Sequence, residues 1–305
     1  MAGSGDSSRA ILFALGANFA IAVAKGLAAF FTGSSAMLAE TVHSLADCGN
    51  QLLLMFGMKQ SRKAPTLDYP LGYGKAIYFW SFLVALMLFA VGGVYSLFEG
   101  WHKLAQPEPI RHWYWAVGVL TFGVIAEGIS MRACLQEIAK IRGERNLWQW
   151  FRESRQAELV VIFGEDLAAL LGLVLALAAV LLSVATGNPV WDAIGTLAIG
   201  LLLVVVAVFV AIEVKALLIG QSMDPEREQL LRDFIQNRPE VGNVISLITL
   251  QLGNEVMVSV QAEMQENQSA IALLHQINAV ERAVKAQFPE VRWSFFEPDL
   301  VKVVT

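Results

Sequence analysis

Six long apolar windows dominate the sequence and constrain its fold more than any other feature. A helix needs about 20 apolar residues to cross a hydrocarbon core of about 30 Å, so each window is long enough to span a lipid bilayer. The chain is 56% hydrophobic and only 16% charged, which is typical of a multi-pass membrane protein. We therefore expect a transmembrane domain over residues 10–220, with helices at 10–32, 35–58, 77–100, 113–134, 158–184 and 190–217.

Lysine and arginine are unevenly distributed among the expected loops. The connections between the first and second windows, and between the fifth and sixth, contain neither residue, whereas the loops after the second and fourth windows contain several. By the positive-inside rule, both termini are then cytoplasmic. The apolar run after the N-terminal tail, residues 1–9, is too long for the h-region of a cleavable signal peptide, and no Arg-rich, Ser-rich transit segment is present. These features favour a bacterial inner membrane.

The pattern changes in residues 221–305, which are polar enough for a cytoplasmic domain. Asp224 and Pro225 are typical of a helix start. Two stretches of alternating hydrophobicity then surround the turn at Gly253 and Asn254, and a helix over 269–288 precedes the short strand "VRWSFF". The order αββαβ predicts a ferredoxin-like α+β domain with one sheet face and edge open, suited to pairing with a second copy in a homodimer.

Ionisable side chains interrupt two of the apolar windows. The stretch "AETVHSLADCGNQ" carries Glu40, His43 and Asp47, and the four-residue spacing of the last two puts them on one helix face. In the fifth window, Glu165 and Asp166 lie at a comparable depth. An ionised side chain at the centre of a membrane helix costs roughly 2.5 to 3.5 kcal/mol, so a group of them needs compensation. One alternative is a set of hydrogen bonds or ion pairs between helices.

A divalent cation would compensate these charges more completely. One imidazole with two or three carboxylates suits tetrahedral Zn²⁺, and also Mn²⁺, Fe²⁺ or Co²⁺. Asn50 could complete or orient such a site, or form a hydrogen bond between helices. Lys25 could neutralise Glu40 or line a proton path, or extend toward an interface. The net charge of -5 gives no basic field for nucleic acid.

Several motifs together resemble the cation diffusion facilitator, or cation efflux, family. They are "HSLAD" in the second window, "YPLGYGKAIYFW" before the third, the acidic pair of the fifth, "DAIGTLAIGLLL" in the sixth and the αββαβ tail. The forms "HSLADCGNQ" and "GEDLAALLGL" are most similar to the branch that includes the mitochondrial zinc transporter of animals. The resemblance covers residues 8–298.

This resemblance implies a homodimer that exports divalent metal from the cytoplasm by alternating access, in exchange for protons. It also implies four ligands, two from helix 2 and two from helix 5, spaced i and i+4. His43, Asp47 and Asp166 match, but the remaining position is Ile162, which cannot bind metal. Glu165 is the nearest replacement, either through a local distortion of the helix or by reaching sideways. Glu127 in the fourth window is the other candidate.

A second metal site of the family is expected to be absent. In the C-terminal domain only His275 and Glu297 match the ligands found in some members, while Gln261 and Phe295 occupy the other positions. Two other functions remain open. A membrane metal sensor or scaffold would bind the ion without moving it. An intramembrane hydrolase would use Glu165 and Asp166 as acid and base, but no nucleophile lies beside them, so we do not expect an enzyme.

Overall fold

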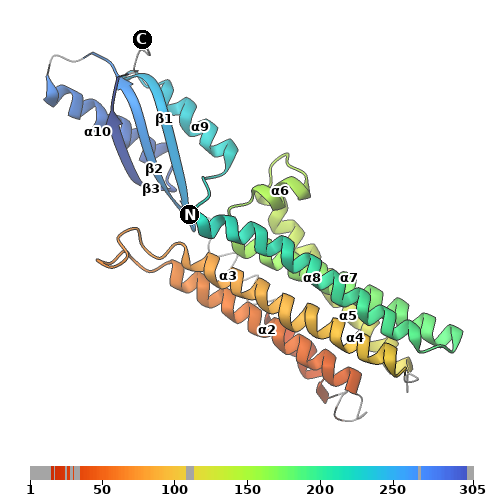
Figure 1. Ribbon diagram of the computed structural model, residues 1–305. Helices are drawn as coiled ribbons and strands as arrows, with labels where there is room; N and C mark the ends of the chain where they lie inside the picture. Colours follow the sequence, from red (N-terminus) through yellow and green to blue (C-terminus); the bar gives the residue numbers. More distant parts are fainter. Residues whose placement is uncertain are drawn as a thin grey trace.

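The computed structural model describes residues 15–30 except 17, 25, 28 and 29, and then residues 35–107, 113–266 and 269–300; for residues 35–43 it describes the backbone alone. The described helices form an elongated bundle with a small α/β unit at one end (Figure 1). The first expected span is residues 10–32, and every residue of it that the structure describes has a helical backbone.

Long helices build the bundle. They are α2 (Ser35–Ser61), α3 (Ala76–Met87), the π-helix η1 (Leu88–Val94), α4 (Tyr95–Ala105), α5 (Trp113–Ile141), α7 (Ala157–Thr186) and α8 (Val190–Ile219). Within the described part of the chain, four helical runs are long and apolar enough to cross a membrane: Ala76–Ala105, Trp113–Ile141, Ala157–Thr186 and Val190–Ile219. These runs confirm the last four expected spans. Helix α2 has the length, but its polar residues lower its mean hydropathy, so it is not one of the four.

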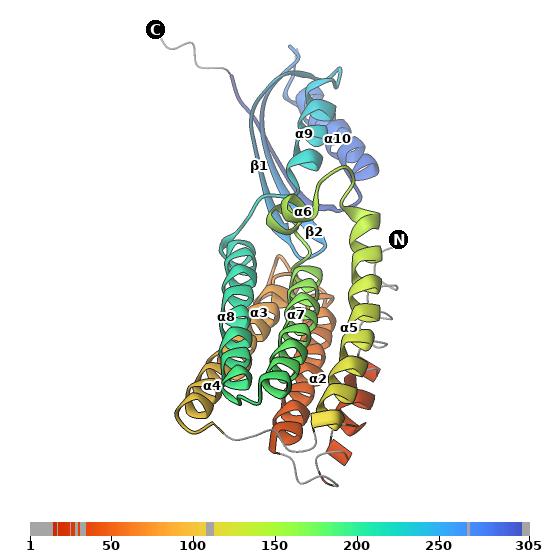
Figure 2. The same ribbon diagram turned by 90° about the vertical axis from the view of Figure 1, so that its right-hand side faces the viewer.

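Each helix of the bundle packs against one or more specific neighbours. Helix α8 lies along α7 and α4, α7 also packs on α5, and α2 packs on α3 (Figure 2). Both η1 and α4 come very close to α8. A Cβ on Gly93 of η1 would lie 2.7 Å from Val204 Cγ2 of α8, and one on Gly200 of α8 would lie 2.8 Å from Leu97 N of α4. Small residues at such crossings let helix backbones approach, as is usual in membranes.

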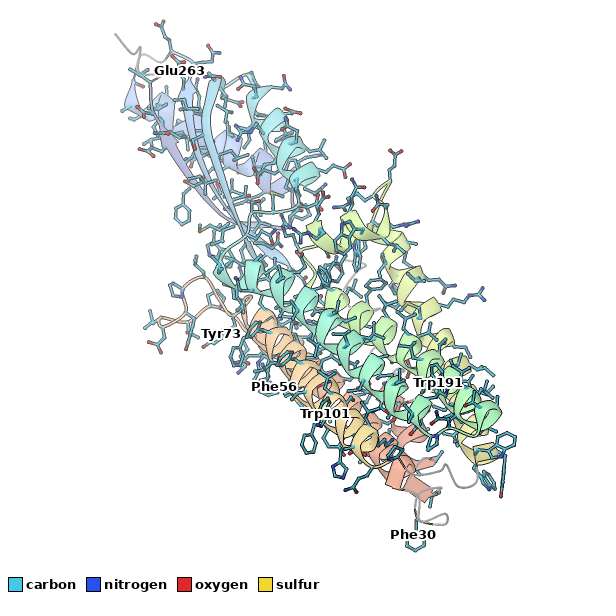
Figure 3. The ribbon with its side chains drawn as sticks, turned by 45° about the vertical axis from the view of Figure 1, so that its right-hand side comes forward. Phe30, Phe56, Tyr73, Trp101, Trp191 and Glu263 are labelled. Atoms are coloured by element: carbon cyan, nitrogen blue, oxygen red, sulfur yellow. The ribbon has the colours of Figure 1, made fainter. Side chains whose placement is uncertain are left out.

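Large apolar side chains cover the outside of the bundle. Phe56 and Trp101 project outward from it (Figure 3) and are 52% and 69% exposed. Phe122 and Leu201 are similarly exposed, on α5 and α8. Contiguous apolar surface of this extent is unfavourable in water and suits contact with lipid.

A short helix that the sequence did not lead us to expect lies between α5 and α7. Helix α6 (Leu147–Glu153) begins with a capping box, in which Asn146 accepts a hydrogen bond from Gln149 N and the Gln149 side chain accepts one from Asn146 N. Trp150 is fully buried and packs edge-on against Phe163 of α7. The helix thereby anchors the connection to α7 on the end of the bundle.

The C-terminal α/β unit, residues 225–298, has the predicted order αββαβ. Its elements are α9 (Pro225–Gln236), β1 (Val241–Leu252), β2 (Glu255–Met264), α10 (Ala270–Gln287) and β3 (Val291–Pro298). The sheet order is β1-β2-β3, with β1 antiparallel and β3 parallel to β2. Both helices pack on one face, where Leu231 and Val280 meet Val258 and Val260. The opposite face carries apolar side chains that no described element covers: Ile248, Leu250, Met257, Trp293 and Phe295.

Candidate metal site

A small cavity lies inside the bundle, between α2, α5 and α7. We call it the ion cavity; its volume is about 20 Å³. Four carboxylates line it, from Asp47, Glu127, Glu165 and Asp166. Its other lining residues are Asn18, Gln51, Leu88, Ala169 and Leu203. A cavity must hold at least about 10 to 15 Å³ to accept one water molecule, so the space is sufficient for a single ion or water.

Glu165 and Asp166 enter the ion cavity from different sides. Glu165 Oε1 accepts a hydrogen bond from Asn50 Nδ2 of α2 at 2.7 Å, and Asp166 Oδ2 accepts one from Ser130 Oγ of α5 at 3.1 Å. Adjacent residues of a helix point about 100° apart. Because α7 is flanked by these two helices at that level, the pair reaches both of them while α7 remains regular from Ala157 to Thr186. No local distortion of the helix is needed.

Two amide oxygens at this level are buried without a partner among the described residues. They are Gln51 Oε1 and Asn50 Oδ1, on side chains that are 7% and 2% exposed. A buried polar atom without a hydrogen bond costs about 1 to 3 kcal/mol, so native structures rarely keep one without a reason. The Gln51 side chain lines the ion cavity, and a cation there would satisfy its oxygen.

Sequence reasoning missed Gln51 and Ser130. Gln51 follows Asp47 by the same four residues that separate Asp47 from His43, so the spacing alone would have found it. Ser130 follows Glu127 by three residues in α5, and no feature of the sequence distinguishes it from other helix serines. Asn50 forms a hydrogen bond between helices, to Glu165 of α7, which is one of the roles that the sequence suggests for it.

Some predicted site residues lie outside what the structure describes. His43 and Glu40 lie on the α2 backbone before Asp47, but their side chains are not described, and Lys25 lies wholly outside the described residues. Among the His, Cys, Asp and Glu residues that are described, no group of three or more could hold a metal ion as arranged. The carboxylates therefore share a cavity without converging on a single point.

Both acidic residues considered in place of Ile162, Glu165 and Glu127, lie beside the ion cavity. Ile162 is partly buried and packs against an apolar cluster that includes Val160 and Leu217. Glu127 of α5 and Glu165 of α7 both line the ion cavity with Asp47. The position of Ile162 is thus apolar, and both alternative acidic residues lie beside the cavity.

The two candidate metal ligands of the C-terminal unit, His275 and Glu297, do not lie together. His275 is exposed on α10, which packs on the face of the sheet that holds Val260. Glu297 pairs in register with Gln261 of β2, so both side chains lie on the opposite face. The sheet separates His275 from Glu297.

The structure is that of a helical, multi-pass membrane protein with a buried acidic cavity and a C-terminal α/β unit, an arrangement suited to a membrane transporter of cations. Comparison with known proteins makes this specific: the chain belongs to the cation efflux family, since the family's transmembrane domain matches residues 11–219. The members of this family are transporters rather than enzymes. The resemblance recognised in the sequence is confirmed.

Several relatives are similar over most of this chain. The proton-coupled zinc antiporter SLC30A9, mitochondrial, of Xenopus laevis is 34% identical over 231 residues, which are 75% of this chain and 41% of the relative. Metal tolerance protein C4 of Arabidopsis thaliana is 31% identical over 233 residues, covering 76% and 51%. The cation-efflux pump FieF of Klebsiella pneumoniae is 25% identical over 288 residues, covering 92% and 89%. The chain spans about two fifths of the length of the mitochondrial relatives it matches.

Proposed function

We propose that this protein is a proton-coupled antiporter that exports a divalent transition metal, zinc in the first place, from the cytoplasm by alternating access. The ion would be held between α2 and α7 by His43, Asp47, Asp166 and Glu165. The observation that carries this proposal is the ion cavity, where four carboxylates meet a buried amide oxygen without a partner among the described residues. The relatives, which include proton-coupled zinc antiporters, support the same function.

A divalent cation accounts for the chemistry of this cavity better than internal hydrogen bonds do. Asn50 and Ser130 each satisfy one carboxylate oxygen, whereas Gln51 Oε1 has no hydrogen-bond donor among the described residues, and a metal ion would supply a partner for it. Binding would draw the carboxylates together from their separate helices. We add Glu127 and Gln51 to the candidate ligands on this ground, with Asn50 as the residue that orients Glu165.

The proposed donor set suits zinc first. A histidine among carboxylates suits zinc, and zinc is the metal named for the mitochondrial relatives. Additional oxygen donors, from Glu127 and Gln51, would widen the site toward Mn²⁺, Fe²⁺ or Co²⁺, which accept more oxygen ligands than tetrahedral zinc does. We propose zinc as the main substrate and these three metals as the alternatives.

The proposed function requires a particular topology. We expect six spans in a transmembrane domain over residues 10–220, with α2 as the second span, because its polar face lines the ion cavity rather than lipid. Following the positive-inside rule, we propose that both termini and the domain over 221–305 are cytoplasmic. The membrane we propose is a bacterial inner membrane, in keeping with the nearly full-length match to bacterial pumps.

We also propose that the protein is a homodimer, through its C-terminal and transmembrane domains. The support lies in the open sheet face, where Ile248 and Phe295 are 62% and 55% exposed and Trp293 lies beside them. A second copy of the same face would bury these side chains symmetrically.

Metal flux into inverted membrane vesicles tests the transport function. With an imposed proton gradient, the unsubstituted protein should accumulate Zn²⁺, while His43→Ala and Asp47→Ala should lose accumulation. Asp192→Asn serves as a matched control, because this carboxylate pairs with Lys103 at 3.2 Å and does not line the ion cavity. Accumulation that survives either alanine substitution would refute the proposed site.

A metal-sensing scaffold remains the second candidate, favoured by the α/β unit that contacts the bundle directly. A scaffold would bind Zn²⁺ in a fixed ratio and would not accumulate it when a proton gradient is imposed. The same vesicle assay therefore separates the two functions.

A further inference from the structure

A second and larger cavity lies where the bundle meets the C-terminal α/β unit. We call it the arginine cavity; its volume is about 350 Å³. Small-molecule sites usually measure about 300 to 1,000 Å³, so it is large enough for a ligand. Three arginines from separate segments line it: Arg145 after α5, Arg155 between α6 and α7, and Arg227 of α9. It shares no lining residue with the ion cavity.

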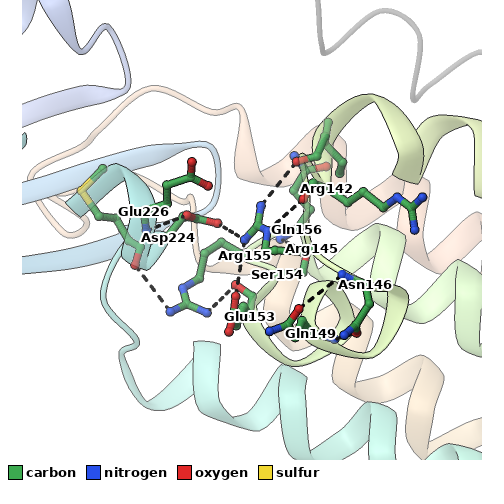
Figure 4. A network of polar contacts seen from close by, with 12 residues as sticks. Arg142, Arg145, Asn146, Gln149, Glu153, Ser154, Arg155, Gln156, Asp224 and Glu226 are labelled. Atoms are coloured by element: carbon green, nitrogen blue, oxygen red, sulfur yellow. Dashed lines mark hydrogen bonds and ion pairs between the residues drawn. The ribbon is translucent and has the colours of Figure 1, made fainter. Parts of the chain in front are cut away.

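The carboxylates in its wall are already neutralised. Asp224 Oδ2 accepts a hydrogen bond from Arg145 Nη1 at 2.6 Å, in an ion pair that joins the connection after α5 to the start of α9 (Figure 4). Glu290, the other lining carboxylate, forms an ion pair with Arg227. Two of the three arginine charges are thereby matched within the wall.

Arg155 supplies the unmatched charge. Its guanidinium donates a hydrogen bond to the backbone carbonyl of Glu153 at 2.7 Å (Figure 4) and another to that of Ser222 at 2.6 Å. In the described part of the chain, no carboxylate oxygen lies within 4.0 Å of it. Burial lowers the pKa of this guanidinium, and the nearby carboxylates of Asp224 and Glu153 oppose that shift only in part. The wall of the cavity therefore carries an excess of positive charge.

We propose that the arginine cavity binds a phosphate-bearing anion. Guanidinium groups present planar pairs of N–H donors that match phosphate oxygens, and the amide side chains of Gln156 and Asn254 add neutral polar groups to the wall. Under the proposed topology this cavity lies at the cytoplasmic ends of the bundle helices, close to where lipid headgroups meet water, and basic pockets there are suited to headgroup phosphates. The phosphate belongs either to a phospholipid headgroup or to a soluble compound.

An occupant would touch both parts of the molecule. Gln156 directly precedes α7, which carries Glu165 and Asp166, whereas Asn254 belongs to the β1–β2 turn. Binding would therefore fasten the α/β unit to the helix that contributes two of the ion-cavity carboxylates. This consequence does not depend on the transport function.

Thermal unfolding of the full-length protein tests the proposal through two separate additions. In one arm, delipidated protein in an uncharged detergent receives inorganic phosphate or pyrophosphate, against chloride at equal ionic strength. In the other, the protein is reconstituted in vesicles of phosphatidylcholine alone or of phosphatidylcholine and phosphatidylglycerol in equal parts. At least one arm should raise the unfolding temperature; the soluble arm identifies a free phosphate compound and the vesicle arm a lipid headgroup.

Two variants and a control complete the experiment. Arg155→Gln should weaken the apparent affinity at least about tenfold, since a charged guanidinium contact is lost. Arg227→Gln should also weaken this affinity. Because this variant leaves the carbonyl contacts of Arg155 intact, it tests the proposal even if Arg155→Gln fails to fold. Arg238→Gln, which removes an arginine paired with Glu240 outside the cavity, should bind normally. Absence of stabilisation in both arms, or undiminished affinity in the folded variants, overturns the proposal.

Discussion

Tyr78 of α3 accepts a hydrogen bond from the backbone N–H of Gly253, at 2.8 Å, in the turn between β1 and β2. Tyr78 is fully buried, and Gly253 adopts a φ of +68°, a left-handed conformation that glycine adopts at little cost. At the same contact, a Cβ on Gly74 would lie 2.1 Å from Leu252 O. The α/β unit therefore docks backbone to backbone on the start of α3, whose continuation reaches Leu88 in the ion cavity.

Removal of the Tyr78 hydroxyl should weaken this docking. In Tyr78→Phe the Gly253 N–H stays buried without its acceptor, which costs about 1 to 3 kcal/mol. We expect a lower thermal unfolding midpoint in detergent and faster amide hydrogen exchange in the β1–β2 turn. Tyr95→Phe, on a half-exposed tyrosine of α4, is the control and should behave as the unsubstituted protein. Equal exchange in the turn of both variants would contradict the docking role.

A side chain at Gly74 should disturb the contact between the bundle and the α/β unit more than the loss of the Tyr78 hydroxyl does. Gly74→Ala places a methyl group against the Leu252 carbonyl, a backbone atom that cannot yield without moving the turn. We expect the turn to lose protection and limited proteolysis between α8 and α9 to accelerate. Gly128→Ala is the matched control, because no heavy atom lies within 4 Å of its new Cβ. The prediction fails if both alanine variants are cleaved at the same rate.

We expect the Gln51 side chain to lower the stability of the metal-free protein and to raise its affinity for metal. In Gln51→Met an amide whose oxygen has no partner among the described residues is replaced by an apolar side chain of similar length, so the metal-free protein should gain about 1 to 3 kcal/mol. Zn²⁺ affinity should fall about tenfold to a hundredfold, the usual effect of losing a group that supports a metal. Calorimetric titration and thermal unfolding measure the two effects.

Gln60 provides the control on the same helix. Its Oε1 accepts a hydrogen bond from Trp80 Nε1 at 2.8 Å, so Gln60→Met should lower stability and leave Zn²⁺ affinity unchanged. A Gln51→Met variant with the same profile as Gln60→Met would show that Gln51 is an ordinary helix contact.

Metal binding should depend on pH with a defined sign. Carboxylates and imidazole bind metal only when deprotonated, so binding releases protons and weakens as the pH falls. Zn²⁺ titrations in buffers of different ionisation enthalpy should show net proton release, and Asp166→Asn should reduce both the release and the slope of affinity against pH. Asp192→Asn should change neither. Affinity that is constant across mildly acidic and neutral pH would exclude these ligands.

The open sheet face should control dimerisation. Phe295→Asp puts a charge on this face, where a second copy would bury it without a partner, so the dimer should dissociate in light-scattering measurements. Ile271→Asp introduces the same charge at a side chain of α10 that is 69% exposed, on the helix-covered side of the sheet. Ile271→Asp should leave the dimer intact, and dissociation of both variants to the same extent would argue against the sheet face.

The helices and strands were largely predictable, because apolar length and alternation are properties of local sequence. The last four expected spans and the αββαβ order agree with the structure to within a few residues in most cases. Helix α6 was missed, because a seven-residue helix made of three aromatic and several polar residues has no clear period. Its stability comes from the capping box and from burial of Trp150 against α7.

Residue spacing alone shows that ionisable residues lie in two apolar helices and that those on α2 share a face, because helix geometry is a local property. Which helices stand opposite one another is decided by packing between distant segments. Only the tertiary structure turns Glu165 toward Asn50 and Asp166 toward Ser130, and only it brings Glu127 into the same cavity. The docking of Gly253 on Tyr78 likewise joins residues far apart in the chain, and no local pattern encodes such a contact.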